Sequence, residues 1–209
     1  MDEGKIKYVG VSELSVENLR KAHAICPITA YQMEWSLFTR DVEEELVPTC
    51  RELGIGEHSS LRGAPWETLF VSGIVAYSPL GRGFLTGAIK SADDIAEDDW
   101  RRTLPRFTEY IDENLKLVEV IREVAEAKGC TMGQVALAWV HAQGEDVFPI
   151  PGTKRVHRLE ENIAAFDFKL TEEEMTKLAV IADKIKGTRY NAMGMAATFD
   201  GLQTSAQTA

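Results

Sequence analysis

Four short apolar runs alternate with helical stretches along this chain, and that alternation limits the fold more than any other feature. The runs cover residues 6–11, 28–33, 74–77 and 147–150. Between them, apolar side chains recur every three or four positions, as they do on one face of a helix. Strands that alternate with helices usually pair in parallel through right-handed crossovers. We therefore predict one α/β domain, either an open sheet or a barrel, without a separate second domain.

Local signals mark helix ends and set apart two further segments. Thr131 with Gln134 matches the capping box, in which both side chains bond backbone N–H groups at the start of a helix. Segment 57–73 mixes Gly, Pro and Ser, so we expect an insertion that forms an irregular surface loop. The domain is predicted to span residues 1–186, and 187–209 is expected to be a loosely ordered tail.

Composition narrows the partners of the chain. Of 209 residues, 44% are hydrophobic, which suits one well-buried domain, and 33 acidic against 23 basic residues give a net charge of -10. Such a charge repels nucleic acid and anionic membrane surfaces, so neither is an expected partner. No run approaches the ~18 apolar residues of a membrane span. We expect a cytoplasmic protein. Cys26, Cys50 and Cys130 lack metal-ligand spacing, so no metal site is predicted.

Residues 147–170 carry the strongest functional signal. A short apolar run leads into a Pro-Gly loop with three basic residues, and a helix follows. Gly152 allows the backbone to approach a ligand, while Lys154, Arg155 and Arg158 place positive charge beside the free N–H groups of the helix start. This arrangement predicts a phosphate pocket. A loop followed by a solvated basic helix end is an equal alternative on these residues alone.

Other polar residues are expected at the same edge of the sheet. In parallel α/β folds, ligands bind beyond the carboxyl ends of the strands. Ser12, Gln32, the 77–83 loop and the 151–155 loop each follow or end a predicted strand. We expect these four places to converge.

Four sequence segments make the chain recognisable when they are taken together. They are GVSE at 10–13, YQMEWS at 31–36, AYSPLGRGFLTG at 76–87 and PIPGTKRVHRLEENI at 149–163. In this order the chain resembles the aldo-keto reductases, and most closely plant members of the auxin-induced and perakine-reductase-like group. The resemblance implies a partial (β/α)8 TIM barrel made of strands five to eight with their helices.

The resemblance also implies NADP(H)-dependent reduction of a small-molecule aldehyde or ketone by hydride transfer. Ser12 and Gln32 would hydrogen-bond the nicotinamide carboxamide, and Tyr77 would stack on the nicotinamide ring. Glu13 departs from the Asn that is commoner in the wider family, although related plant members share Glu. A contact between position 13 and the carboxamide is therefore left open.

The remaining cofactor contacts follow from the same resemblance. Three residues, Ser78, Leu80 and Arg82, would lie along the pyrophosphate. Gly152, Thr153 and Lys154 would surround the adenosine phosphates, Arg158 would reach the 2′-phosphate, and Glu161 and Asn162 would hold the adenine. Guanidinium and ammonium groups suit phosphate, and amides suit the edge of a base. The structural alternatives are core packing for Tyr77, an ordinary buried amide for Gln32, and pairing of Arg82 with the acidic stretch 93–99.

No catalytic residue is assigned. The resemblance implies an acid/base Tyr assisted by Lys, Asp and His, all contributed by the first four strands of the barrel. We expect that half to be missing from this chain. Two functions follow as alternatives: an aldo-keto reductase whose activity is impaired, or a non-catalytic NADP-binding or regulatory fragment. A remnant that binds nothing is a third reading.

Four parallel strands would leave two unpaired edges. Unpaired backbone groups at a sheet edge favour pairing with another chain. We therefore predict self-association through the sheet edges, or poor folding of the isolated chain.

Overall fold

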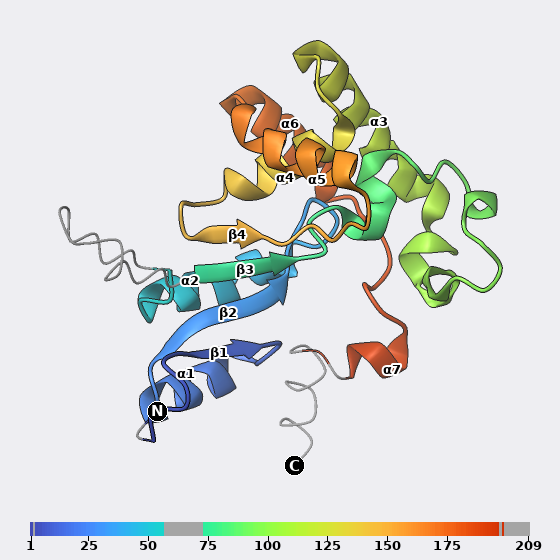
Figure 1. Ribbon diagram of the computed structural model, residues 1–209. Coiled ribbons are helices and arrows are strands. Elements are labelled where there is room, and N and C mark those ends of the chain that lie inside the picture. The colour runs from blue at the N-terminus through green and yellow to red at the C-terminus, as the bar shows by residue number, and fades with distance from the viewer. Residues whose placement is uncertain (2, 57–72, 197, 199–209) are drawn as a thin grey trace.

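A computed structural model describes residues 1, 3–56, 73–196 and 198. Its centre is one four-stranded sheet with the order β1-β2-β3-β4 and all neighbouring strands parallel (Figure 1). The strands are β1 (Val9–Ser12), β2 (Ile28–Glu34), β3 (Gly73–Tyr77) and β4 (Val147–Pro149). Strand and helix alternate as the apolar pattern predicts.

Helices connect and cover the strands. They are α1 (Val16–Ile25), α2 (Leu46–Glu52), α3 (Ile111–Lys128), α4 (Met132–His141), α5 (Val156–Ile163), α6 (Glu172–Ala182) and α7 (Ala192–Met195). Short 3-10 helices lie at Asp41–Glu43, Gly81–Thr86, Ala92–Asp94, Trp100–Thr103, Pro105–Phe107 and Ala164–Asp167.

The predicted capping box at the start of α4 is confirmed. The Thr131 hydroxyl accepts a hydrogen bond from the Gln134 backbone N–H at 3.2 Å, and the Gln134 side chain accepts one from the Thr131 N–H at 2.9 Å. These bonds satisfy two donors that the helix itself leaves unpaired. They fix α4 against the end of α3, which Gly129 terminates in the left-handed conformation with φ 66°.

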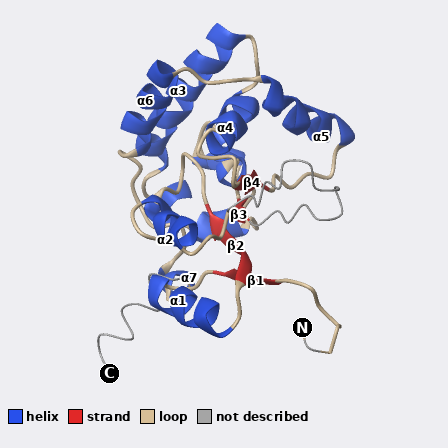
Figure 2. Ribbon diagram, turned by 90° about the vertical axis from the view of Figure 1, so that its left-hand side faces the viewer, coloured by secondary structure: helices blue, strands red, loops and turns tan. Residues whose placement is uncertain are grey.

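The core lies on one face of the sheet. Because side chains alternate along a strand, every second residue of β2 and β3 points to the same side. Tyr31, Met33, Ile74 and Ala76 all have 0% exposure and join one hydrophobic cluster with residues of α1 to α4 and α6. Figure 2 shows α1 and α2 together on one side of the strands. The opposite face stays more open, and Phe148 is 37% exposed there.

The predicted fold class is wrong. We expected a partial (β/α)8 TIM barrel built from strands five to eight. The structure has instead an open sheet of four parallel strands, whose spatial order is their order in the sequence, counted from β1 at the start of the chain. Sequence motifs at strand ends indicate the order of neighbouring strands. They do not indicate which strands of a larger fold these are.

Strand boundaries differ from the pattern at both outer strands. β1 begins at Val9 rather than at residue 6, because its pairing with β2 starts at Val9 opposite Ile28. Ile6 is 53% exposed and precedes the strand. At the other edge, β4 ends at Pro149, one residue before the end of the apolar run, although the Ile150 N–H still donates to the Ala76 carbonyl oxygen at 3.0 Å.

The expected insertion at 57–73 lies outside the described residues except for Gly73, the first residue of β3. In the described part of the expected tail, α7 forms and Arg189 is 1% exposed.

No helix in the described ranges has the length and apolar character needed to cross a lipid bilayer.

Candidate functional site

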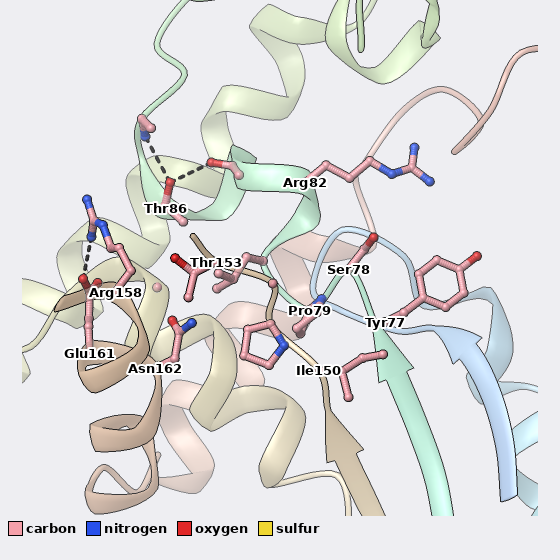
Figure 3. Close-up of a pocket in the computed structure, with 16 residues that line it drawn as sticks. Tyr77, Ser78, Pro79, Arg82, Thr86, Ile150, Thr153, Arg158, Glu161 and Asn162 are labelled. Atoms are coloured by element: carbon pink, nitrogen blue, oxygen red, sulfur yellow. Dashed lines mark hydrogen bonds and ion pairs between the residues drawn. The ribbon is translucent and has the colours of Figure 1, made fainter. Parts of the chain in front are cut away.

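A cavity of about 610 Å³ opens beyond the carboxyl ends of β3 and β4 (Figure 3). The segment that follows β3 forms one wall, and the β4–α5 loop with the first turns of α5 forms the other. The lining residues are Tyr77, Ser78, Pro79, Leu80, Arg82, Gly83, Thr86, Ala88, Gly133, Ile150, Pro151, Gly152, Thr153, Arg158, Glu161 and Asn162. Its size is in the range of small-molecule and cofactor sites.

Nine of the twelve predicted site residues line this cavity. They are Tyr77, Ser78, Leu80, Arg82, Gly152, Thr153, Arg158, Glu161 and Asn162. They come from two segments about seventy residues apart in the chain, which the parallel pairing of β3 with β4 brings together. The predicted convergence of the 77–83 and 151–155 loops is therefore what the structure shows.

The helix end of the cavity is polar and accessible. A Cβ added at Gly152 would meet no atom within 4 Å, so open space lies beside that backbone. The Thr153 hydroxyl accepts a hydrogen bond from the Arg155 N–H at 3.1 Å, which shapes the entry into α5. The Arg158 guanidinium pairs with Glu161 at 2.5 Å and remains 51% exposed. A charged group at the surface can exchange such a partner for a phosphate at low cost.

Three predicted residues lie outside the cavity lining. Lys154 borders an adjoining hollow that shares Arg82, Gly152 and Thr153 with the cavity. Ser12 and Gln32 stand opposite each other in the β1–β2 register, and both side chains are exposed. They lie at the carboxyl ends of neighbouring strands, on the same side of the sheet as Val75.

Arg82 contributes to the cavity wall, but its guanidinium points away from the cavity (Figure 3). It forms an ion pair with Glu34 at 2.7 Å, and both side chains are buried, at 9% and 3% exposure. It also donates to the Arg189 carbonyl oxygen at 2.6 Å and lies over the Tyr190 ring, 4.4 Å from its centroid. Its carboxylate partner is Glu34, not a residue of the acidic stretch 93–99.

Glu34 is the centre of a buried charge cluster. Burial raises the pKa of its carboxyl, and the nearby Arg82, Arg189 and Arg106 act in the opposite direction. The Thr39 hydroxyl donates a further hydrogen bond to Glu34 at 3.2 Å. The cluster ties the end of β2 to the segment after β3 and to the chain near residue 189.

Tyr77 ends β3 and is held through its hydroxyl. The hydroxyl donates to Glu13 Oε1 at 2.8 Å, and the Tyr190 hydroxyl lies 3.4 Å away. Burial raises the pKa of Tyr77 strongly, and the Tyr190 and Glu13 contacts raise it further. The phenol therefore stays neutral near pH 7 and holds its proton tightly. Tyr77 also belongs to the cavity lining, so core packing alone does not describe this residue.

Sequence reasoning missed Glu34, Arg189 and Tyr190. Glu34 carried one signal, since it is the charged residue that ends a largely apolar strand, and a buried carboxylate there requires a partner. Arg189 and Tyr190 carried none. They lie in a segment without periodicity, and the residues they contact are more than one hundred positions away in the sequence.

Known proteins match this chain in sequence and in structure. The model of the Aldo/keto reductase family matches residues 1–59 and 72–183, starting at the first residue. A thermostable aldo-keto reductase solved with the inhibitor epalrestat is 27% identical, with a TM-score of 0.60 over 86% of this chain and 50% of that chain. The glycerol dehydrogenase of Gluconobacter oxydans is 24% identical, with a TM-score of 0.73 over 88% of this chain and 51% of that one.

The chain thus spans about half the length of these solved structures. The gap in the family match, residues 60–71, falls within the segment expected to be an insertion.

Proposed function

Because the chain belongs to the aldo/keto reductase family of oxidoreductases, we propose that its cavity binds NADP(H). The observation that carries this proposal is the gathering of nine expected cofactor residues around one cavity of about 610 Å³. The donor set suits a dinucleotide phosphate, because it combines an exposed guanidinium, a hydroxyl and a glycine backbone with open space beside it.

We propose that the adenosine end binds at the β4–α5 loop and the nicotinamide end at Tyr77. Arg158 and Lys154 would hold the 2′-phosphate and neighbouring phosphates, since both are exposed basic groups at the start of α5. Asn162, which is 9% exposed, offers an amide to the adenine edge beside Glu161. Ser12 and Gln32 would meet the carboxamide beyond the strand ends. In a complete reductase site, NADPH held in this way would supply the hydride that reduces an aldehyde or ketone carbonyl.

We further propose that this chain binds the cofactor without turning over substrate by itself. Carbonyl reduction needs an acid that releases a proton readily near neutral pH. Tyr77 is the tyrosine that lines the cavity, and its raised pKa makes it a poor proton donor. The alternative is reduction of an aldehyde or ketone by this chain. It would require a proton donor other than Tyr77, and the carboxyl group in the cavity lining, Glu161, is paired with Arg158 at 2.5 Å.

Replacing Arg158 by alanine should weaken NADPH binding about 10- to 100-fold, because a charge-assisted bond to phosphate contributes about 1.5–3 kcal/mol. The affinity for NADH, which lacks the 2′-phosphate, should fall much less in the same variant. Titration of NADPH fluorescence measures both constants. Arg51→Ala is the matched control, since Arg51 pairs with Asp146 at 2.9 Å and does not line the cavity.

Two results would contradict these proposals. Absence of any saturable fluorescence change with wild-type protein would exclude NADP(H) binding. NADPH oxidation with a reactive aromatic aldehyde, clearly above background and lost in Arg158→Ala, would exclude the non-catalytic form of the proposal.

We expect the purified chain to self-associate through its sheet edges. Within the described ranges, β1 and β4 each pair with one neighbour only, and α5 exposes Val156, Leu159 and Ile163 beside β4, at 73%, 50% and 59% exposure. Size-exclusion chromatography with light scattering measures the mass in solution. A compact, well-folded monomer would contradict this prediction.

The finer assignments stay predictions. They are membership of the plant auxin-induced and perakine-reductase-like group, location in the cytoplasm, and a small-molecule carbonyl compound as substrate. The cavity-lining groups do not identify which carbonyl compound would be the substrate.

A further inference from the structure

We propose that Glu13 and Arg189 are positioning residues that fix the Tyr77 ring for stacking on the cofactor. This inference rests on the proposed binding of NADP(H), and it assigns a role to two residues outside the cavity lining. Both would act through the Tyr77 hydroxyl, which Glu13 accepts.

The contacts form a chain from the end region of the protein to the end of β3. Arg189 donates to both Glu13 oxygens, with Nη2 at 2.9 Å and Nη1 at 3.2 Å. The same Glu13 Oε1 accepts the Tyr77 hydroxyl at 2.8 Å. The carboxylate therefore joins a guanidinium and a phenol, and its direction is set by a two-point contact with the guanidinium plane.

Burial makes this contact directional. Arg189 is 1% exposed, and the Glu13 side chain is 20% exposed. In such surroundings charged hydrogen bonds are stronger than in water, and neither partner rotates freely. The Arg189 segment is itself held, because Arg82 donates to the Arg189 carbonyl oxygen.

The backbone at Glu13 supports a specific role for its side chain. Glu13 has φ 53°, the left-handed region that residues other than glycine seldom adopt. It follows β1 directly, and its N–H donates to the Gln32 carbonyl oxygen at 3.3 Å. Non-glycine residues persist in this conformation when surrounding contacts hold them there. In this conformation the Glu13 carboxylate accepts the Tyr77 hydroxyl at 2.8 Å.

Fixing the hydroxyl fixes the ring. A tyrosine ring is oriented by two side-chain torsions, and a hydrogen bond at its far end restrains both. A ring already in its binding orientation loses less conformational freedom when a ligand stacks on it. Loss of the hydrogen bond at the Tyr77 hydroxyl should therefore weaken binding of the nicotinamide end of the cofactor. Binding of the adenosine end should stay unchanged.

The test compares two ligands on the same variants. NADPH reaches both ends of the proposed site, whereas 2′,5′-ADP reaches the adenosine end only. Tyr77→Phe keeps the ring and removes the hydroxyl, and we expect it to weaken NADPH binding about three- to tenfold with 2′,5′-ADP unchanged. Glu13→Ala should give the same pattern. The double variant should be no weaker than either single one, because both remove one contact.

Two further variants separate positioning from folding. Arg189→Lys keeps the charge and should retain part of the NADPH affinity, whereas Arg189→Ala should lose as much as Tyr77→Phe. Tyr110→Phe removes a hydroxyl at the start of α3, outside the cavity lining, and should change neither constant.

Each outcome decides the inference. Equal weakening of both ligands would overturn it, since that result marks a general structural role. Additive losses in the double variant would also overturn it. If wild-type protein binds 2′,5′-ADP and NADPH equally well, the ring makes no contribution, so the inference fails while the proposed function stands. If wild type binds neither ligand, the proposed function fails as well.

Discussion

Replacing Glu34 by alanine should lower the free energy of unfolding by about 3–5 kcal/mol, because it removes the counter-charge of buried arginines. Arg82 pairs with Glu34 at 2.7 Å, and Arg106 and Arg189 lie close enough to influence the Glu34 pKa. Urea titration followed by tryptophan fluorescence measures the loss. A buried ion pair is weak evidence of net stabilisation, but removal of one partner leaves an uncompensated charge in the interior.

An exposed pair provides the control for Glu34. Arg20 and Glu52 form an ion pair at 2.5 Å, with side chains 42% and 63% exposed. Glu52→Ala should leave the free energy of unfolding nearly unchanged, since solvent screens such pairs. Equal losses in the two variants would show that the buried cluster does not depend on Glu34.

The pH dependence of Glu34 has a definite sign. Burial raises its pKa in the folded protein, so the folded state binds this proton more tightly than the unfolded chain. The resulting stabilisation is fully present below the unfolded pKa and is lost as pH rises through the folded pKa. Relative to Glu34→Gln, which cannot titrate, wild type should therefore gain stability as pH falls through the folded pKa towards the ordinary value of 4.5. A difference that stays constant over this range would contradict the assignment.

The second large effect is expected at Phe84. This side chain is 0% exposed, stacks on Phe38 with ring centroids 4.7 Å apart, and meets Phe107 edge-on at 5.5 Å. Phe84→Ala should cost about 3–5 kcal/mol in the free energy of unfolding, because it opens a cavity in a packed aromatic cluster. Phe84 lies in the 3-10 helix Gly81–Thr86, which supplies one cavity wall, so NADPH affinity should fall too.

Phe166 is the matched control for this substitution. It is 67% exposed and contacts His141, with ring centroids 3.9 Å apart. Phe166→Ala should cost no more than about 1 kcal/mol and should leave NADPH binding unchanged. Comparable losses for the two alanine variants would mean that the aromatic cluster does not hold the cavity wall.

Sequence patterns predicted the features that depend on near neighbours. The capping box at Thr131 and Gln134 is a signal within four consecutive residues, and the structure confirms it. The apolar runs gave the four strands, because burial of one strand face imposes a pattern within a few residues. The start of β1 was misplaced, since its first paired residue is decided by β2, a separate segment of the chain.

Long-range contacts explain what could not be predicted. Arg82 was expected along a pyrophosphate, yet its guanidinium points to Glu34, 48 positions earlier, and to the Arg189 carbonyl, 107 positions later. No periodicity links such residues, because the tertiary fold alone brings them together. The prediction that these are strands five to eight of a barrel was wrong for a related reason. A motif at the end of one strand does not show the position of that strand in the whole fold.

The Arg189–Glu13 contact also has a consequence for the order in which this protein folds. It closes a loop of 176 residues, and the partner of Glu13 leaves the ribosome long after β1 and β2 have been made. Contacts of such separation form late, because the entropy of closing the loop must be overcome first. During synthesis, the sheet can therefore form while the ring of Tyr77 is still unanchored, and the ring end of the cavity takes its final shape only after Arg189 has been made.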